Sequence, residues 1–541
     1  MKSVKTGRKI LLLIILLSPL ALYLESCKKA DTVTPPVVNN STNTLPILTT
    51  TTVSSITATS AITGGNISSD GGLPILSRGV VWSTSSNPTI ALSAKTIDGT
   101  GTGSFISNLS GLSPDTTYFA RAYATTSLGT AYGNEVSFKF SSLSSIPNIW
   151  NQVGNKLVGS GAIGNALQGG SVAISADGNT LVFSGHADNG GSGAIWIFNR
   201  TNNVWNQVAK LVGSDAVGNS FQSSVAISAD GKTVIVGGAR DNYNTGAAWI
   251  FTLNNGIWAQ QGSKLVGTGA VGKAHQGSSV SISGDGNTVV IGGAIDNGIE
   301  GNGFSDTEAV GAAWIFTRNN GIWAQQGSKL VGTGAVGKAA QGSSVSISGD
   351  GNTVVIGGNF DNMDITGRYA GAAWIFTRNN GIWSQQGDKL VGTGGGFANQ
   401  GHSVSISGDG NTVVIGGFAD NNNIGAAWIF TRNNGIWAQQ GSKLVGSGAN
   451  GNAQQGASVS ISGDGNSLVI GGLTDNNGGA AWIFTRNNGI WAQQGSKLVG
   501  LGADGKAYQG VSVSINSDGT TVAVGGAIDN GYKGAVWIFN R

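Results

Sequence analysis

The most regular feature of the chain is a pattern of apolar and polar positions that repeats between Ile149 and Arg541. Fourteen of the 15 tryptophans fall into two series spaced 53 to 65 residues apart, so the period is not an accident of composition. A repeat of this length with strand-like patterning is typical of a propeller or a stacked array. The two series stand at positions 150, 205, 258, 323, 383, 437 and 491, and at 196, 249, 314, 374, 428, 482 and 537.

Each copy of the repeat predicts four strands, as its third copy illustrates. Residues 279–283 alternate serine with apolar residues, whereas 288–293 and 311–316 are almost continuously apolar, as expected of strands covered on both faces. Residues 322–326 are more polar. Asp285-Gly286 and Asn320-Gly321 are dipeptides that favour tight hairpin turns between these strands.

The order of these segments predicts an architecture. Small serines suit a crowded innermost strand, and a polar fourth strand suits the rim, but one such sheet cannot bury both of its faces alone. The region begins with a fourth-strand sequence at 149–152 and ends with a third-strand sequence at 534–539. We therefore predict an all-β fold in which residues 144–541 form a seven-bladed β-propeller closed by its N-terminal strand.

Two segments of the third copy, 276–286 and 311–316, resemble the FG-GAP repeat. The resemblance covers about 390 residues and implies the seven-bladed propeller of integrin α-subunits and many bacterial surface proteins. The chain departs from that family in two ways. The leading Phe-Gly is Gln-Gly in six copies and Gln222-Ser223 in the second, and the acidic calcium loop is missing.

Residues 46–143 form a second predicted domain, a β-sandwich of short alternating strands separated by turn residues. Residues 111–123 resemble the corner and following strand of a fibronectin type III domain. The resemblance implies that the Tyr118 hydroxyl bonds back to the backbone. Modules of this kind are spacers or adhesive units, and none implies a catalytic group.

The first 26 residues have the layout of an export signal: a basic start, then an apolar run from Ile10 to Leu17 that Pro19 to Leu24 extends. The run ends in Leu-Glu-Ser-Cys27, which resembles a bacterial lipobox, and Cys27 is the only cysteine. We expect lipidation of Cys27, a tether over 27–45, and a cell-envelope location at the outer membrane or cell surface. An ordinary signal peptide or a helical anchor is the alternative.

Charge excludes one class of partner. Residues 1–26 hold four basic groups and one acidic group, which accounts for the whole net charge of +3. The remainder is near neutral, so no basic surface favours nucleic acid. Glycine is abundant, at 90 residues, but follows no collagen period. We expect a monomer.

A recurring Asp-Gly turn is the first candidate for metal chemistry. Calcium needs six to eight oxygen ligands, and each turn offers a single carboxylate. A hairpin turn is therefore the preferred interpretation, and we expect no cofactor, with calcium as the minor alternative. These aspartates are at 177, 230, 285, 350, 409, 464 and 518.

An Asp-Asn pair follows the second strand of every copy, and a glutamine recurs in each joining loop. Both loops are expected on one face, where they could bind sugar hydroxyls or cations, although local bonding that orders the loops is the alternative. A recurring lysine in Lys-Leu-Val-Gly is expected at the surface, in an ion pair worth at most about 1 kcal/mol. The aspartates are Asp188, Asp241, Asp296, Asp361, Asp420, Asp475 and Asp529, and the glutamines are Gln168, Gln222, Gln276, Gln341, Gln400, Gln455 and Gln509.

Two insertions break the symmetry of the repeat. One in the third copy contains Glu300, Phe304 and Asp306, and one in the fourth contains Arg368 and Tyr369. Both follow an Asp-Asn pair, in adjacent copies. Loops on a rigid scaffold are common recognition sites, so we predict that these residues border a binding patch, with neutral loop growth as the alternative.

No catalytic set is evident in the sequence. His186, His275 and His402 lie in three different copies, and the glycine-rich stretches precede strands instead of helices. Near-identical copies also repeat the same groups, whereas an active site needs different groups in one place. We expect an adhesion or ligand-binding protein with a protein or polysaccharide partner. The alternatives are a propeller enzyme acting on polysaccharide and a purely structural surface protein.

Overall fold

The computed structural model describes residues 43–53, 60–113, 116–139, 150–298 and 309–541. The chain divides into two compact units, the first ending at residue 140 and the second beginning at residue 141. Both consist almost entirely of antiparallel sheets, so the predicted all-β class is confirmed. No helix within the described ranges is both long and apolar enough to cross a lipid bilayer.

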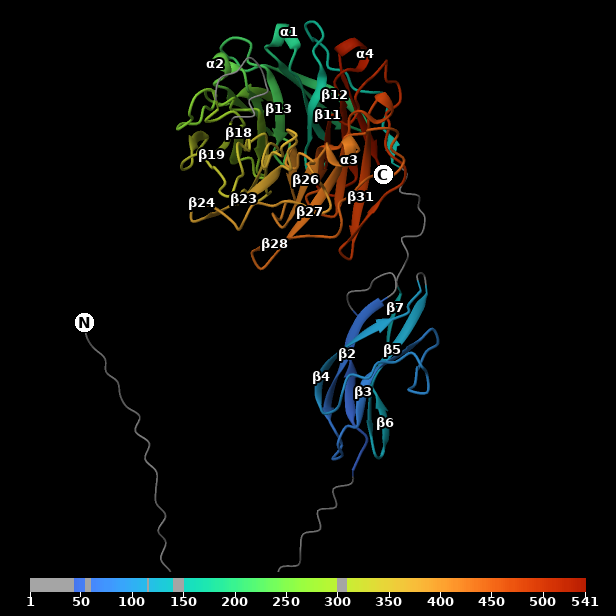
Figure 1. The fold of residues 1–541 in the computed structure, drawn as a ribbon. Coiled ribbons are helices and arrows are strands. Elements are labelled where there is room, and N and C mark those ends of the chain that lie inside the picture. Colours follow the sequence, from blue (N-terminus) through green and yellow to red (C-terminus); the bar gives the residue numbers. More distant parts are fainter. Residues whose placement is uncertain (1–42, 54–59, 114–115, 140–149, 299–308) are drawn as a thin grey trace, which may run out of the picture. The chain divides into compact units, whose positions relative to one another are not determined.

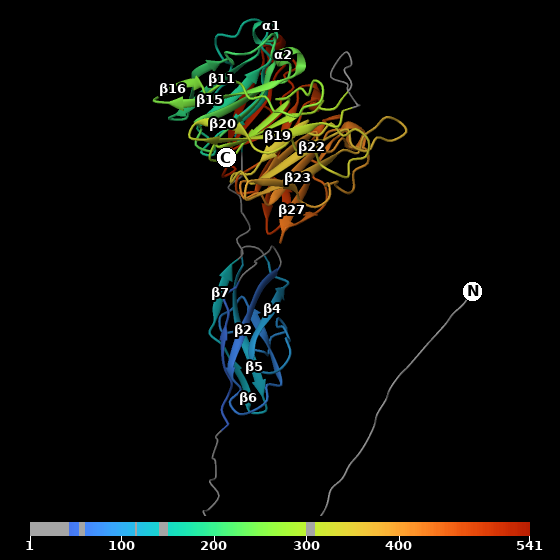
Figure 2. The ribbon, with the colours of Figure 1, turned by 90° about the vertical axis from the view of Figure 1, so that its left-hand side faces the viewer.

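The first unit consists of two antiparallel sheets around one core (Figure 2). Its core contains Val80, Trp82 and Leu109, which are buried. The Tyr118 hydroxyl accepts a hydrogen bond from the Ser113 backbone N–H at 3.0 Å, which is the backward bond expected of this side chain. One sheet holds β1 (Ile47–Thr50), β2 (Ser60–Ser69) and β4 (Gly103–Ser110); the other holds β3 (Ser77–Ser83), β5 (Thr117–Thr126), β6 (Gly129–Tyr132) and β7 (Val136–Lys139).

The second unit contains seven four-stranded antiparallel sheets, numbered here in chain order as sheets 1 to 7. Sheet 1 is β9 (Gln168–Ile174), β10 (Thr180–Gly185), β11 (Ala194–Thr201) and β12 (Val204–Leu211). Sheet 2 is β13 (Gln222–Ile227), β14 (Thr233–Gly238), β15 (Ala247–Asn254) and β16 (Ile257–Gln260). Sheet 3 is β17 (Ser279–Ile282), β18 (Thr288–Gly293), β19 (Ala312–Asn319) and β20 (Ile322–Gln325). Sheet 4 is β21 (Ser344–Ile347), β22 (Thr353–Gly358), β23 (Ala372–Asn379) and β24 (Ile382–Gln385).

The remaining sheets follow the same order. Sheet 5 is β25 (Ser403–Ile406), β26 (Thr412–Gly417), β27 (Ala426–Asn433) and β28 (Ile436–Gln439). Sheet 6 is β29 (Gln455–Ile461), β30 (Ser467–Gly472), β31 (Ala480–Asn487) and β32 (Ile490–Gln493). Sheet 7 is β33 (Ser512–Ile515), β34 (Thr521–Gly526) and β35 (Ala535–Asn540), with β8 (Asn151–Gln152) as its outer strand.

Burial within a sheet follows the predicted strand roles. The second and third strands are buried along most of their length, and the tryptophan of every third strand is fully buried. In sheet 3, Trp314 lies opposite Ile291 across the ladder. The glycine that ends Lys-Leu-Val-Gly is required by the packing of the next sheet, because a Cβ on Gly332 would lie 2.1 Å from Cδ1 of Trp374 in sheet 4.

The serines of the inner strands connect each sheet to the next. The Ser279 hydroxyl of sheet 3 accepts a hydrogen bond from the Val345 N–H of sheet 4 at 2.9 Å, and the pattern recurs around the unit. Its last member joins sheet 7 to sheet 1, because the Ser512 hydroxyl accepts from the Val172 N–H at 3.0 Å. The serines thus occupy the innermost strands, as predicted, and their hydroxyls also form hydrogen bonds between neighbouring sheets.

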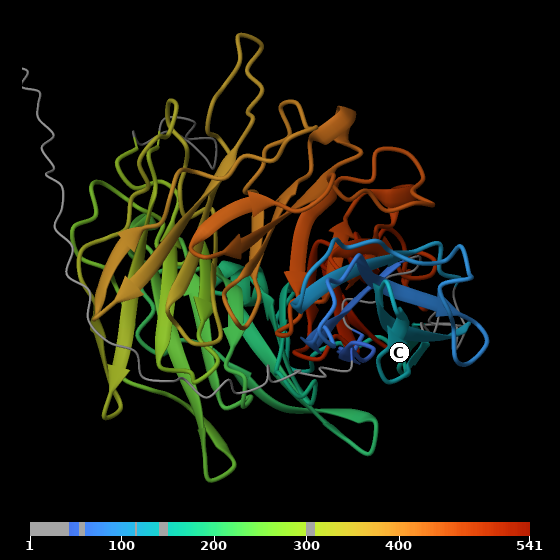
Figure 3. The same cartoon turned by 90° about the horizontal axis from the view of Figure 1, so that it is seen from below.

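The turns after the inner strands form a second connecting series of backbone hydrogen bonds. Gly284 N–H donates to the Gly349 carbonyl at 2.9 Å, and Ser517 N–H donates to the Ala176 carbonyl at 3.1 Å, which returns from sheet 7 to sheet 1. Figures 1 and 3 show the same order, with the red last sheets beside the teal first sheet. The second unit is thus a β-propeller-like arrangement.

Short helical turns occur where the sequence predicted only loops. They follow the second strand and begin at the aspartate of the Asp-Asn pair, which is followed by asparagine in a left-handed conformation. These turns are α1 (Asp188–Gly191), α2 (Asp241–Asn244), α3 (Asp420–Asn423), the 3-10 turn Asp475–Asn477, and α4 (Asp529–Tyr532).

Candidate binding site

The aspartates of the Asp-Asn pairs are buried, which corrects the expectation that all seven carboxylates are displayed on a face. Asp361 illustrates the arrangement: Oδ1 accepts a hydrogen bond from Val336 N–H at 2.7 Å, and Oδ2 pairs with Lys389 at 2.5 Å. Local bonding therefore explains most of the recurrence. The buried aspartates are Asp188, Asp241, Asp296, Asp361, Asp420, Asp475 and Asp529.

The recurring lysines are partners of these aspartates, not independent surface groups. Lys389 is 18% exposed and Asp361 only 1%. Removing a lysine would leave a carboxylate buried without its cation, which costs about 3–5 kcal/mol, well above the value expected for a surface pair. The other pairs are Lys156–Asp529, Lys210–Asp188, Lys264–Asp241, Lys329–Asp296, Lys443–Asp420 and Lys497–Asp475.

The recurring glutamines are also buried, so they do not form the expected exposed ring. Gln341 accepts a hydrogen bond from Gly332 N–H and donates one to the Gly332 carbonyl, at 2.5 and 2.9 Å. The side chain thus holds its joining loop in place from inside. The same burial applies to Gln168, Gln222, Gln276, Gln400, Gln455 and Gln509.

The fifth copy departs from this pattern at Asp420. Its joining segment, Gly394-Gly395-Gly396-Phe397, is one residue shorter than Gly-Ala-Val-Gly-Lys at 334–338. In the six other copies a backbone N–H of the joining segment donates to Oδ1 of the aspartate. No described residue donates a hydrogen bond to Oδ1 of Asp420, and Oδ2 binds Lys443 at 2.5 Å. The shorter segment thus leaves one carboxylate oxygen for a ligand.

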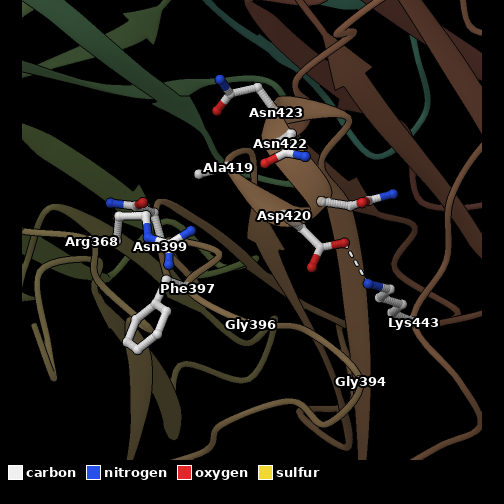
Figure 4. A pocket seen from close by; sticks show the side chains of 11 residues that line it. Arg368, Gly394, Gly396, Phe397, Asn399, Ala419, Asp420, Asn422, Asn423 and Lys443 are labelled. Atoms are coloured by element: carbon white, nitrogen blue, oxygen red, sulfur yellow. Dashed lines mark hydrogen bonds and ion pairs between the residues drawn. The ribbon is translucent and has the colours of Figure 1, made fainter. Parts of the chain in front are cut away.

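Asp420 lines a pocket of about 500 Å³ between loops of the fourth and fifth copies, here called the loop pocket. Figure 4 shows Arg368, Phe397 and Asn399 on one side of it and Asp420, Asn422 and Asn423 on the other. Its volume lies within the usual range for small-molecule sites. The remaining lining residues are Gly394, Gly396, Ala419, Asn421 and Lys443.

The insertion of the fourth copy supplies Arg368. Met363 and Tyr369 pair across this loop, and Asp364 binds the Arg368 guanidinium at 3.3 Å. Desolvation raises the pKa of Asp364, but hydrogen bonds from Arg368 and Thr366 outweigh it and lower the pKa to about 2. The Arg368 guanidinium also lies 5.4 Å from the centre of the Phe397 ring.

Two neighbouring features orient the remaining groups. Tyr369 packs against Phe360 at 4.9 Å between ring centres, and its carbonyl accepts a hydrogen bond from Asn399 N–H at 3.0 Å. Asn421, Asn422 and Asn423 are all left-handed, with φ between 47° and 67°, and their side chains are exposed. Asparagine tolerates this conformation better than most residues, so the turn presents three amides beside the pocket.

The structure brings together only part of the predicted patch. Arg368 and Asp420 line one pocket, Tyr369 lies behind it, and Cys27, Glu300, Phe304 and Asp306 are outside the described residues. Asn421 belongs to a predicted Asp-Asn pair, whereas Phe397, Asn399, Asn422 and Asn423 were not predicted. An alignment of residues 394–397 with residues 334–338 shows that the fifth copy lacks one residue beside Phe397.

The Asp-Gly turns behave as hairpin turns. Asp285 accepts hydrogen bonds from Ser283 Oγ and Asn287 N–H at 2.5 and 2.9 Å. Partial burial raises the pKa of Asp285, but these bonds outweigh it and lower the pKa below its usual value. Within the described ranges, no group of three or more His, Cys, Asp or Glu side chains is placed to hold a metal ion.

Comparison with known proteins identifies no relative. No protein-family model and no curated protein matches the chain. Similar solved structures include Kuenenia stuttgartiensis hydrazine synthase (12% identity, 71% of this chain, 99% of that one, TM-score 0.44), the GH74 xyloglucanase of Xanthomonas campestris (13%, 77%, 71%, 0.30) and AofleA from Arthrobotrys oligospora (12%, 59%, 82%, 0.35). With TM-scores below 0.5, these similarities establish neither fold nor function for this chain.

Proposed function

We propose that this chain is a cell-envelope protein whose second unit binds a polysaccharide at the loop pocket. The observation that carries the proposal is the free Oδ1 of Asp420, in a pocket that is also lined by a guanidinium, several amides and an aromatic ring. A carboxylate oxygen accepts hydrogen bonds from sugar hydroxyls, amides both donate and accept, and Phe397 offers an apolar face. A protein ligand is the other outcome of the test.

The lining of the loop pocket favours binding over hydrolysis. Glycoside hydrolysis normally uses two carboxyl groups that flank the scissile bond. Asp420 is the one carboxylate among the residues that line this pocket, and its other oxygen is committed to Lys443. A polysaccharide held here would therefore meet one free carboxylate oxygen and no partner acid.

The proposal extends to the form in which the site is presented. We propose that the seven sheets are the blades of a closed seven-bladed β-propeller, supported by the hydrogen bonds that return from sheet 7 to sheet 1. We further propose that a lipid on Cys27 anchors the chain at the outer membrane or cell surface, with the fibronectin-like unit as a spacer. Metabolic labelling with a lipid precursor, compared between the native chain and Cys27→Ala, tests the anchor.

The sharpest test of the loop pocket replaces its shortened joining segment. Residues 394–397 are exchanged for the Gly-Ala-Val-Gly-Lys of 334–338, a sequence that the same scaffold already accepts. The exchange should supply the missing N–H to Asp420 and remove Phe397, so binding on a glycan array should be lost while the melting temperature is retained.

Tyr243→Ala is the matched control, because Tyr243 occupies in the second copy the place that Asn422 has in the fifth, and it is 79% exposed. It should bind as the native chain does. Undiminished glycan binding after the exchange would overturn the proposal. A native chain that binds a protein but no glycan would overturn it as well. A hydrolysis screen of bound glycans distinguishes binding from turnover.

A further inference from the structure

Copies 3 to 6 of the repeat are nearly identical in their strands, and three of the positions at which they differ flank the start of the inner strand and the end of the second strand. These are the residue before the recurring glutamine, the residue two after it, and the residue two before the Asp-Asn aspartate. In chain order the first position holds His275, Ala340, Asn399 and Gln454, the second Ser278, Ser343, His402 and Ala457, and the third Ala294, Asn359, Phe418 and Leu473.

Exposure to solvent does not explain this variation. The first residue of the outer strand is far more exposed, at 70–73%, and is isoleucine in all four copies. The four residues of the outer strand differ at one position only, where copy 4 has Ser384 and the other three copies have alanine. The outer strand thus keeps its exposed isoleucine in all four copies, whereas the positions beside the inner strand vary. The constant residues are Ile322, Ile382, Ile436 and Ile490.

The backbone at the first position strengthens this conclusion. Its φ lies between 53° and 58° in all seven copies, a conformation that favours glycine and costs other residues about 1 kcal/mol. No copy uses glycine. The side chains are thus retained at a cost in stability, as expected when they have another role. They are Leu167, Phe221, His275, Ala340, Asn399, Gln454 and Tyr508.

Members of each of the three positions line a second pocket of about 560 Å³, which we call the axial pocket because the inner strands of several sheets line it. They are Leu167 and Tyr508 at the first position, Gly170, Ser224, Ser278, Ser343, His402 and Val511 at the second, and His186 and Ala527 at the third. His186, His402 and Tyr508 lie among the serines of these strands. The turns at the other end of the inner strands are joined from sheet to sheet by the backbone hydrogen bonds described above. The serines concerned are Ser171, Ser224, Ser279, Ser344 and Ser512.

The chemistry of the axial pocket is polar but uncharged. Each of the five serine hydroxyls accepts a backbone N–H from the neighbouring inner strand, so its own proton can be donated to a ligand. Desolvation by the surrounding protein lowers the pKa of His402 to about 4, and burial lowers that of His186, so both imidazoles are neutral at pH 7. No carboxylate, ammonium or guanidinium lines the pocket.

The axial pocket also adjoins the loop pocket. Asn399 lines the loop pocket and His402 lines the axial pocket, and the two residues share one turn in which His402 N–H donates to the Asn399 carbonyl at 3.2 Å. A chain of linked sugars could contact both.

We propose that the axial pocket binds an uncharged sugar residue of the same polysaccharide, through the serine hydroxyls, His186, His402 and Tyr508. This deepens the proposed function and rests on it. Aromatic and aliphatic groups such as Tyr508 and Val511 would cover the apolar faces of the sugar, while hydroxyls and neutral imidazoles exchange hydrogen bonds with it.

The test uses substitutions that the repeat itself contains. His402→Ser restores the residue of copies 3 and 4, and Tyr508→Ala restores that of copy 4. The full chain in detergent is first screened on an array of neutral and acidic oligosaccharides, and the best neutral binder is then titrated calorimetrically. The double variant should lose about tenfold or more in affinity, because hydrogen bonds and ring contacts are removed together.

Ile382→Ala, at the constant isoleucine of the outer strand, should bind like the native chain. His186→Ala, which restores the residue of copies 2 and 3, gives a second reading if the double variant melts early. Unchanged affinity in folded axial variants, or exclusive binding of acidic oligosaccharides, would refute the axial site. If the joining-segment exchange abolishes binding while the axial variants keep it, this inference alone fails; if the native chain binds no glycan, both proposals fail.

Discussion

The outer contacts between sheets 3 to 6 differ from those around sheets 7, 1 and 2. In the regular part, the outer-strand tryptophan donates its indole N–H to a glutamine of the preceding sheet, as Trp383 does to Gln326 at 2.8 Å. The indole N–H groups of Trp150, Trp205 and Trp258 are buried without a partner among the described residues. We call the part around sheets 7, 1 and 2 the seam.

At two boundaries of the seam, those of Trp205 and Trp258, a single residue has changed, whereas the sheet before Trp150 keeps its glutamine, Gln494. Val153 follows Gln152 and donates its N–H to the Ile538 carbonyl at 2.8 Å, as Gln326 does to Ile315, so valine occupies the place of the glutamine. Val208 follows Gln207 in the same way. The inner serine bonds, in contrast, continue across the seam. The hydrogen bonds between inner strands are thus present at every boundary between sheets. Among the described residues, the outer tryptophan–glutamine hydrogen bond is present only at the regular boundaries, so we expect these to be more stable than the seam.

Deleting residues 149–158 should have the largest effect. It removes β8, the buried Trp150 and the lysine that neutralises Asp529. Losing a buried tryptophan and leaving a buried carboxylate unpaired together cost roughly 5 kcal/mol or more. Calorimetry should show a much lower melting temperature for the second unit. An unchanged melting temperature would contradict closure by β8.

Gln326→Val should convert a regular boundary into one like the seam. It removes the acceptor for Trp383 and for the Arg378 guanidinium, which lies 3.2 Å away. Leaving two partly buried donors without this partner should cost about 2 kcal/mol, measured by denaturant unfolding. Ile382→Val, at an exposed site on β24 beside Trp383, should cost almost nothing. Equal effects of the two substitutions would count against the contrast.

Val153→Gln should have the smallest effect, in the opposite direction. It places an acceptor where Gln326 provides one, within reach of the Trp205 indole, and should stabilise the seam by about 1 kcal/mol. Val158→Gln, at an exposed valine nearby, is the control. If both substitutions stabilise the unit equally, the cause is the replacement of a valine by a polar residue and not the new acceptor for the Trp205 indole.

The sequence predicts the sheets well because their information is local. Alternating serines, continuous apolar runs and Asp-Gly turns each act within a few residues, so the four strands of a copy can be assigned from 279–326 alone. The repeat region begins with a fourth-strand segment and ends with a third-strand segment. This order predicts that the first segment completes the last sheet, as β8 does in sheet 7. Repetition makes both inferences stronger than any single copy would.

The candidate site is harder to predict because its geometry depends on distant partners. An Asp-Asn pair reads as an exposed polar loop, and only the structure shows the lysine some 20 to 30 residues later that buries the carboxylate of Asp361. The free oxygen of Asp420 results from one missing residue in a different loop. The axial pocket gathers single residues from several copies, which no local pattern connects.

The way β8 joins sheet 7 has a mechanical consequence. On the side of the first unit, the described backbone of the second unit begins with Trp150 and β8, whose two residues pair with Phe539 and Asn540. Tension applied along that backbone therefore acts first on an outermost, two-residue strand, where bonds break one after another instead of all at once. Under load the seam should open before any regular boundary, while the serine hydrogen bonds between inner strands still hold the remaining sheets together.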